Sequence, residues 1–342
     1  MPIFQPQLIK KLSLPLVLTG VNCLILFNFS ILTARASITY TPTRIEPTVL
    51  ILTKPIAMPF EKLTEDQLKA FHRDGYLLVK NFCSKQETDK LYSTATGDRS
   101  IRENALDLND QSGKKTKLSL WFTPGNDVFG YLTRSARMVN AVAQLLDSDA
   151  PVCHFHSKLM QKEPKVGGAW EWHQDYGYWY KNQFMFPDQL LSVMIALTKA
   201  NRENGCLQVI RGSHKLGRVN HGFSGEQVGA DMVMVENALK TMDLVYCELD
   251  PGDALFFHSN LLHRSEANLS EFPRWSVISC YNSQSNPAYN EQSTSWKIPV
   301  EPVPDDALLN RESVPFAQAD FLKKENDPAL KETGWESSVK VS

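Results

Sequence analysis

Residues 192–210 read SVMIALTKANRENGCLQVI. Two apolar runs, 192–197 and 206–210, flank a polar segment that contains Asn204-Gly205, a dipeptide typical of turns. Two further runs have the same character, ALFFH at residues 254–258 and WSVISCY at residues 275–281. Short apolar runs separated by turns predict strands of an all-β core. The sequence therefore predicts a mainly β domain with a core of the jelly-roll, cupin-like type.

The residues before this core carry helical signals. Segments 64–67 (TEDQ) and 84–87 (SKQE) match the capping box that begins a helix. Apolar residues recur at three- and four-residue spacing over 135–147, which predicts a third helix. Residues 97–116 are polar, and we expect a loop there. Helices should therefore flank the β core.

Composition excludes several classes of protein. The chain has 342 residues, a formal net charge of −2 and 42% hydrophobic residues. This apolar content is sufficient for a large core, which excludes wholesale disorder. The balanced charge argues against a nucleic-acid binder that relies on an overall positive field. The six cysteines contain no CxxC pair, so neither a disulfide scaffold nor a zinc ribbon is expected.

The N-terminal part of the chain differs from the rest. Within residues 1–57, two lysines precede an apolar stretch over 12–32, and Ala34-Arg35-Ala36 follows it. This pattern is typical of a cleaved secretory or organelle-targeting signal, but an uncleaved membrane anchor and a gene-model extension remain open. Membrane contact is expected only if residues 12–32 are retained, and otherwise the protein should be cytoplasmic. We expect the catalytic domain over residues 58–300 and a C-terminal tail over 301–342.

Candidate metal ligands lie within residues 172–275. Side chains alternate along an extended chain, so His173 and Asp175 should point to the same side. A turn and the apolar run 254–258 then lead to His263. Two histidines and one carboxylate can form a facial triad, which leaves coordination positions open for Fe(II) oxygen chemistry. Arg274 would offer a planar fork to a carboxylate such as that of 2-oxoglutarate.

These blocks resemble the phytanoyl-CoA dioxygenase family of Fe(II)/2-oxoglutarate oxygenases, which also includes ectoine hydroxylases. The resemblance covers roughly residues 63–282. It rests on His173-Gln174-Asp175, on residues 204–215 (NGCLQVIRGSHK), on residues 251–253 (PGD), and on His263, Ser265, Asn268 and Arg274.

The resemblance implies a double-stranded β-helix core and a set of site residues. It implies that Fe(II) is held by His173, Asp175 and His263. It implies that 2-oxoglutarate is held by Arg274 with help from Ser265, and Lys117 falls where some members place a cosubstrate-binding lysine. O2 is the second cosubstrate, and we expect ascorbate to serve as reductant in vitro.

Two departures from the family pattern lie near the expected cosubstrate site. Met194 stands at a strand position where members have Trp or Ser, and His156 and Lys158 occupy another variable lining position. The detailed 2-oxoglutarate contacts therefore cannot be transferred from the family.

The substrate is harder to predict. Aromatic residues surround the H-x-D motif between Trp170 and Tyr180 and could enclose an apolar chain or a cation. We expect hydroxylation, desaturation or oxidative cyclisation of a small specialised metabolite, such as an amine or amino-acid derivative, with release of succinate and CO2. The alternatives are a fatty acyl-CoA 2-hydroxylase, a catalytically silent binding protein on this scaffold, and a cupin isomerase that needs no 2-oxoglutarate. The oligomeric state stays open.

A glycosylation sequon bears on the compartment. Asn268-Leu269-Ser270 lies between His263 and Arg274, where we expect an exposed turn near the rim of the active site. We expect the mature enzyme to begin between residues 37 and 58 and to carry no glycan at Asn268.

Overall fold

The structure is a computed structural model that describes residues 62–180, 184, 186–224, 226–288, 297–316 and 319–323. Its helices are α1 (Glu65–Asp74), α2 (Lys85–Gly97), α3 (Arg99–Glu103), α4 (Val128–Thr133), α5 (Ala136–Leu146), α6 (Asp175–Trp179), α7 (Met232–Thr241), α8 (Ala307–Asn310) and the short 3-10 helices η1 (Pro187–Gln189) and η2 (Ser213–Leu216). Its strands are β1 (Tyr76–Val79), β2 (Leu106–Asn109), β3 (Lys115–Trp121), β4 (Val152–Lys162), β5 (Trp170–His173), β6 (Leu190–Ala196), β7 (Leu207–Ile210), β8 (His221–Ser224), β9 (Gln227–Ala230), β10 (Leu244–Cys247), β11 (Ala254–His258), β12 (His263–Ser265) and β13 (Arg274–Ser283).

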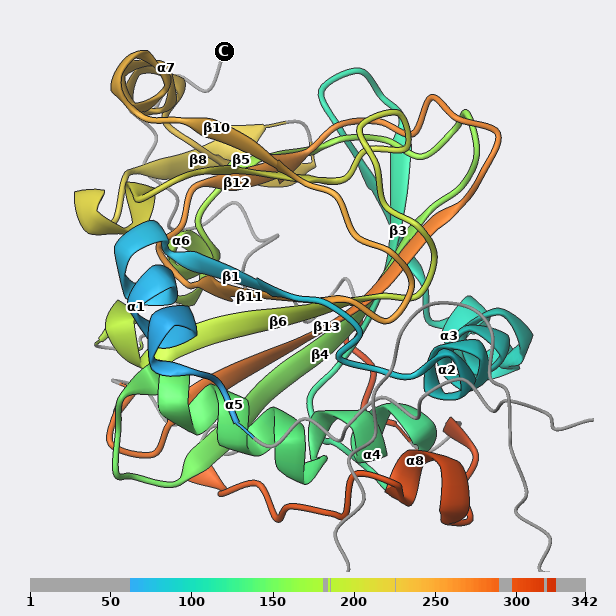
Figure 1. Cartoon of the computed structure of the whole chain (residues 1–342). Coiled ribbons are helices and arrows are strands. Elements are labelled where there is room, and N and C mark those ends of the chain that lie inside the picture. The colour runs from blue at the N-terminus through green and yellow to red at the C-terminus, as the bar shows by residue number, and fades with distance from the viewer. Residues whose placement is uncertain are drawn as a thin grey trace, which may run out of the picture. The chain divides into compact units, whose positions relative to one another are not determined.

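Two antiparallel sheets form the core (Figure 1). The larger sheet has the strand order β1-β11-β6-β13-β4-β3-β2, and the smaller one has the order β10-β7-β12-β5. The hairpin of β8 and β9 forms a third, two-stranded sheet. This is the predicted jelly roll, because strands that are distant in sequence pair within two facing sheets.

The large sheet separates two apolar cores. Along β6, Val193 and Ile195 contribute to the core on the helix side, whereas Met194 and Ala196 contribute to the core between the two sheets. The same alternation places Phe256 of β11 in the first core. Figure 1 shows α4, α5 and α8 along the outer face of this sheet. Period-two alternation of a strand that is buried on both faces explains why β6 is apolar throughout.

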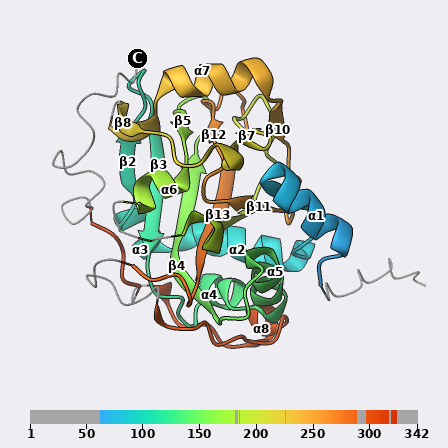
Figure 2. The ribbon, with the colours of Figure 1, turned by 90° about the vertical axis from the view of Figure 1, so that its left-hand side faces the viewer.

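The small sheet is covered on its outer face by α7, as Figure 2 shows. Val235 and Ala238 of α7 are buried in one cluster with Trp172 of β5 and Ile210 of β7. The inner face of the small sheet therefore faces the large sheet, and the site described below lies between them.

Most predicted elements are confirmed. Thr64 and Ser84 cap α1 and α2 with both hydrogen bonds of a capping box, and α5 falls within the helix predicted over 135–147. The loop expected over 97–116 is wrong, because this segment contains α3 and β2. Ile101 and Leu108 are buried there, so a few apolar anchors order a segment whose average composition is polar.

The expected boundary at residue 300 also needs correction. Val303, Leu308 and Phe316 are buried in the core on the helix side of the large sheet, and the Phe316 ring packs edge-on against Trp121 with centroids 4.8 Å apart. Residues 301–316 therefore belong to the domain rather than to a separate tail. The segment predicted as a targeting signal, residues 1–57, lies outside the described residues. Within the described part of the chain, no helix has the length and apolarity needed to cross a bilayer.

Candidate active site

Two side chains from the small sheet and one from the helix that follows β5 converge at the inner face of that sheet. His173 ends β5, Asp175 begins α6, and His263 begins β12. His263 pairs directly with His173 in the β12–β5 ladder. Asp175 Oδ1 lies 3.7 Å from His173 Nε2 and 3.9 Å from His263 Nε2. One ligand atom from each of the three residues lies within 4.8 Å of the others, and all three residues are buried.

The backbone sets the tautomer of both histidines. His173 Nδ1 lies 2.7 Å from the Glu171 carbonyl oxygen, and His263 Nδ1 lies 2.8 Å from that of Leu261. Because a carbonyl oxygen only accepts, each Nδ1 carries the proton and each Nε2 presents its lone pair to the centre of the cluster. Burial lowers the pKa of His263 to about 3, so its ring is neutral at physiological pH. Neutral imidazoles with a fixed orientation are suited to bind a divalent metal.

Asp175 completes the set with a negative charge. Burial alone would raise the pKa of Asp175, but the nearby Lys158 ammonium and the adjacent rings of His173 and His263 bring that pKa below its usual range. The Ser192 hydroxyl donates to Asp175 Oδ2 at 2.6 Å, which leaves Oδ1 directed at the two histidines. Two nitrogens and one oxygen in a buried cluster fit the 2-His-1-carboxylate set that binds Fe(II) with open positions.

Gln174 lies between the two ligands His173 and Asp175, and its hydrogen bonds fix the conformation of this segment. Gln174 donates its side-chain amide to the carbonyl oxygens of Gly217 and Asn260, and its backbone N–H donates to His221 Nε2 at 2.9 Å. His221 packs so closely that a Cβ on Gly177 would lie 2.2 Å from His221 Nε2. The extended backbone of Gln174, with φ −112° and ψ 135°, presents His173 and Asp175 to the same side, as the sequence predicted.

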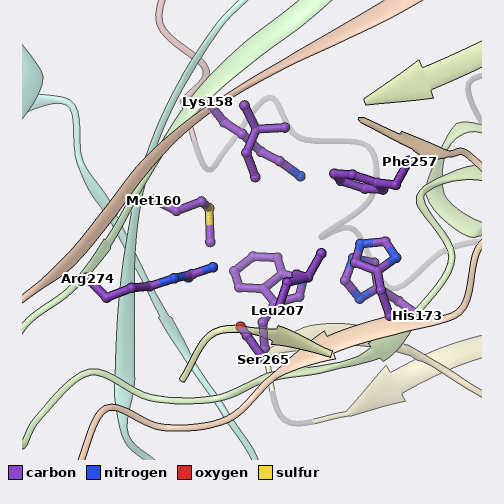
Figure 3. A pocket seen from close by; sticks show the side chains of 10 residues that line it. Lys158, Met160, His173, Leu207, Phe257, Ser265 and Arg274 are labelled. Atoms are coloured by element: carbon purple, nitrogen blue, oxygen red, sulfur yellow. The ribbon is translucent and has the colours of Figure 1, made fainter. Parts of the chain in front are cut away.

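A pocket extends from the two histidines into the space between the sheets. Figure 3 shows Arg274 and His173 on opposite sides of it, with Met160 on the side of Arg274 and Phe257 on the side of His173. The lining residues are Lys158, Met160, Trp170, His173, Leu207, Phe257, His263, Ser265, Arg274 and Ile278.

Arg274 is a buried cation with no ionic partner in the described part of the chain. Its residue is 2% exposed, its Nε has no hydrogen-bond partner, and its Nη2 lies 3.7 Å from the Met194 sulfur. Among the described residues, no carboxylate forms an ion pair with its guanidinium. Burial lowers the pKa of Arg274 to about 10, so the group stays charged at neutral pH. A buried charge without a partner costs several kcal/mol, which an anion in the pocket would offset.

Ser265 lines the same pocket, and its backbone carbonyl oxygen accepts a hydrogen bond from Lys162. The Lys162 ammonium is fully buried and donates to the carbonyl oxygens of Ser265 at 3.2 Å and Glu266 at 2.5 Å. Burial, and then the charge of Arg274, lower the pKa of Lys162 well below its usual value. The structure thus brings Arg274 and Ser265 together, as the family resemblance implied.

Lys117 is not brought to the pocket. It is exposed on β3, where it pairs with Gln161 on one side and with Asp107 on the other. The expectation that Lys117 contacts the cosubstrate therefore has no support in the structure. Lys158 lines the pocket instead, and its position on the same face of β4 as Met160 is the period-two signal that could have identified it.

The sequon is also placed differently than expected. Asn268 is buried rather than exposed, and its side-chain amide donates to the carbonyl oxygens of Lys162 at 3.0 Å and Phe272 at 2.8 Å. Its carbonyl oxygen accepts from the backbone and the hydroxyl of Ser270. These hydrogen bonds shape the loop between β12 and β13.

Comparison with known proteins adds independent evidence. Residues 71–276 match the family described as phytanoyl-CoA dioxygenase (PhyH). An ectoine dioxygenase from Bordetella bronchiseptica is 27% identical over 248 residues, which cover 66% of this chain and 77% of that protein. An L-proline trans-4-hydroxylase from Streptomyces griseoviridis is 27% identical over 267 residues, which cover 73% of this chain and 94% of that protein.

Solved structures share the fold. The apo form of EctD from S. alaskensis superposes with a TM-score of 0.57 at 22% identity and covers 71% of this chain and 89% of that one. The epimerase SnoN in complex with Fe3+, alpha ketoglutarate and nogalamycin RO gives a TM-score of 0.56 at 20% identity, over 78% of this chain and 98% of that one. The chain therefore belongs to the phytanoyl-CoA dioxygenase family and is an Fe(II)- and 2-oxoglutarate-dependent dioxygenase.

Proposed function

We propose that the protein oxidises a C–H bond of a small specialised metabolite, with an amine or amino-acid derivative as the preferred class, and that His173, Asp175 and His263 hold its Fe(II). Arg274 and Ser265 hold the distal carboxylate of 2-oxoglutarate in this proposal. The observation that carries it is the buried Arg274 guanidinium, which has no ionic partner among the described residues. It is directed into a pocket whose other side holds two histidines with free Nε2 lone pairs.

The side chains around the pocket act by position and charge. Asp175 supplies the negative charge that a divalent ion needs, and Ser192 keeps one of its oxygens directed at the histidines. Arg274 and Ser265 would bind one end of 2-oxoglutarate, so that its other end is directed at the ligand cluster. Leu207 and Phe257 add apolar side chains to the lining of this space. When bound, iron together with 2-oxoglutarate and O2 supplies the oxidising chemistry, and 2-oxoglutarate is converted to succinate and CO2.

The relatives support a small substrate. The ectoine dioxygenase and the L-proline trans-4-hydroxylase act, by their names, on small molecules. A probable phytanoyl-CoA dioxygenase from Caenorhabditis elegans is 25% identical over 237 residues, so an acyl-CoA substrate is the competing outcome of the test.

A metabolite library tests the proposal. The protein is supplied with Fe(II), 2-oxoglutarate, O2 and ascorbate, and succinate and product mass are measured for each compound. We expect succinate release coupled to a mass gain of one oxygen, or a loss of two hydrogens, for a small amine or amino-acid derivative. Coupling only to acyl-CoA esters would contradict the substrate class. Failure to bind iron and to release succinate would indicate a silent scaffold, and turnover without 2-oxoglutarate would indicate an isomerase.

A further inference from the structure

A four-residue turn at the end of β11 contacts both parts of the ligand set. It runs from His258 to Leu261, and the Leu261 N–H closes it by donating to the His258 carbonyl oxygen at 2.9 Å. The Leu261 carbonyl oxygen is also the acceptor that orients the ring of His263. On the other side, the Asn260 carbonyl oxygen accepts from the Gln174 side chain at 2.7 Å. The turn therefore acts on one ligand directly and on the other two through Gln174.

A further contact joins the same turn to α6. The N–H of Tyr176, the residue after Asp175, donates to the Ser259 carbonyl oxygen at 2.9 Å. Three consecutive carbonyl oxygens, those of residues 259–261, thus each accept a hydrogen bond from a segment that carries metal ligands. A shift of the turn would change the positions of the ligands relative to one another.

The imidazole of His258 fixes the conformation of this turn. The residue is buried, and its Nδ1 lies 3.0 Å from the backbone nitrogen of Asn260. Because a backbone N–H only donates, Nδ1 must present its lone pair and Nε2 must carry the proton. Nε2 then donates to Asp188 Oδ1 at 3.1 Å. The neutral ring satisfies both contacts, whereas a proton on Nδ1 would place two donors against each other.

The groups that face the His258 ring act on its protonation in opposite directions. Asp188 of η1 favours the protonated ring, and its contact with His258 lowers the pKa of the Asp188 carboxyl. From η2, the His214 ring packs against His258 with centroids 5.1 Å apart, and the positive charge of Lys215 follows it in the chain. Burial lowers the pKa of His214 to about 4, so this neighbour is neutral above pH 5.

The remaining sides of His258 are occupied by β6 and by the end of α1. β6 contributes the apolar Leu191, which pairs with His258 in the β11–β6 ladder. At the end of α1, the His72 carbonyl oxygen lies 3.2 Å from His214 Nε2, and Asp74 pairs with Arg73 at 2.6 Å. Asp188 is therefore the carboxylate that pairs with the His258 ring, and its charge favours uptake of a second proton.

We propose that His258 is a positioning residue for the metal ligands, and that protonation of its ring weakens metal binding. This role rests on the proposed function, since it takes the facial triad as the ligand set. When the ring is protonated, the Asn260 N–H loses its acceptor and the turn shifts. The carbonyl oxygens of residues 259–261 then no longer hold the ligand-bearing segments in their places. His258 does this from outside the pocket, whose lining does not include it.

Metal affinity as a function of pH tests this role. Binding of Mn(II), used in place of Fe(II), is measured by titration calorimetry between about pH 5.5 and 7.5, where imidazoles commonly titrate. His258→Asn keeps an acceptor close to the position of Nδ1 but cannot take up a proton there. Between pH 7.5 and 5.5 we expect the wild type to lose roughly tenfold more affinity than His258→Asn, as for one lost hydrogen bond. His258→Leu lacks the acceptor and should bind Mn(II) weakly at both pH values.

Amide hydrogen exchange on the metal-free protein reports on the turn itself. After correction for the intrinsic pH dependence of exchange, residues 260–263 should exchange faster at pH 5.5 than at pH 7.5 in the wild type. In His258→Asn the two corrected rates should be equal. His72→Asn changes an exposed histidine on α1 and serves as the matched control. Its exchange rates and its Mn(II) affinity should follow those of the wild type at every pH.

The outcomes separate the role of His258 from the proposed function. Equal losses of Mn(II) affinity in the wild type and His258→Asn, or pH-independent exchange in the turn, would overturn the role. The comparison of these two proteins does not depend on whether His258→Leu folds. Absence of Mn(II) binding to the wild type at pH 7.5 would instead refute the proposed function. The exchange measurement needs no metal and would still decide whether His258 holds the turn.

Discussion

The two sheets of the core divide the chemistry of the site between them. The small sheet and its continuation into α6 present His173, Asp175 and His263, whose ring orientations and charges are already set by hydrogen bonds within the protein. The large sheet presents Arg274 and Lys158, two cations without a hydrogen-bonded carboxylate among the described residues. One side is thus prepared for a metal cation, and the other is incomplete without anions. The difference shows that a preorganised site can be recognised both by polar groups whose hydrogen bonds are complete and by buried polar groups that lack a partner.

The largest effect should come from removing the charge on the small-sheet side. Asp175→Asn keeps the shape and the contact with Ser192 but replaces the carboxylate by an amide, which is a poor ligand for Fe(II). We expect loss of Mn(II) binding by calorimetry and loss of succinate release, with a native circular-dichroism spectrum. His173→Ala and His263→Ala should behave in the same way. Asp107→Asn, an exposed carboxylate on β2, is the control and should bind metal normally. Near-normal turnover in Asp175→Asn would disprove the triad.

The next effect tests the large-sheet side. Arg274→Met removes the planar fork that would bind 2-oxoglutarate, and a lost charge-assisted pair is worth about 1.5–3 kcal/mol, or roughly ten- to a hundredfold in the 2-oxoglutarate KM. The same variant should raise or preserve the melting temperature of the ligand-free protein, because a buried unpaired charge is removed.

The control for Arg274→Met is Arg264→Met. Arg264 lies on β12 and bonds to Gln208 and Glu266, outside the pocket. The Arg264→Met substitution should leave the KM for 2-oxoglutarate unchanged. An unchanged KM in Arg274→Met would transfer the carboxylate to another cation.

A smaller effect concerns the neutral histidine behind the triad. Burial lowers the pKa of His221 to about 3, from 6.5 when it is exposed in the unfolded chain. Between these values the unfolded state binds a proton that the folded state does not bind. The free energy of unfolding should therefore fall as the pH falls from 6.5 toward 3, with a contribution from this group of about 1.4 kcal/mol per pH unit. In His221→Gln, denaturant titrations between pH 4 and 6 should show a shallower dependence, and an unchanged slope would mean that His221 is not responsible.

The smallest expected effect is that of Lys117→Met. Lys117 is exposed on the far side of β4 from β13, and it does not line the pocket. The KM of the Lys117→Met variant for 2-oxoglutarate should equal that of the wild type in succinate assays. A several-fold increase would restore Lys117 as a cosubstrate contact and would show that β3 moves toward the pocket when ligands bind.

The sequence by itself determined the local features of this protein. Strand alternation placed His173 and Asp175 on one side, capping boxes located the starts of α1 and α2, and the apolar runs located β6, β7, β11 and β13. These features depend on neighbours within a few residues, whose geometry is set by the backbone period of a strand or helix. The family resemblance added the pairing of these residues with His263 and Arg274.

Only the tertiary structure decided which charges meet in the pocket. Lys117 and Lys158 are both lysines on adjacent strands, yet one is exposed and the other points between the sheets, because strand register and facing are set by packing across the whole sheet. The same long-range packing buries Asn268 in a loop whose sequence suggests an exposed sequon. It also leaves Arg274 without an ionic partner in the part of the chain that the structure describes. Whether a buried charge finds a partner depends on residues distant in sequence, so no local pattern records it.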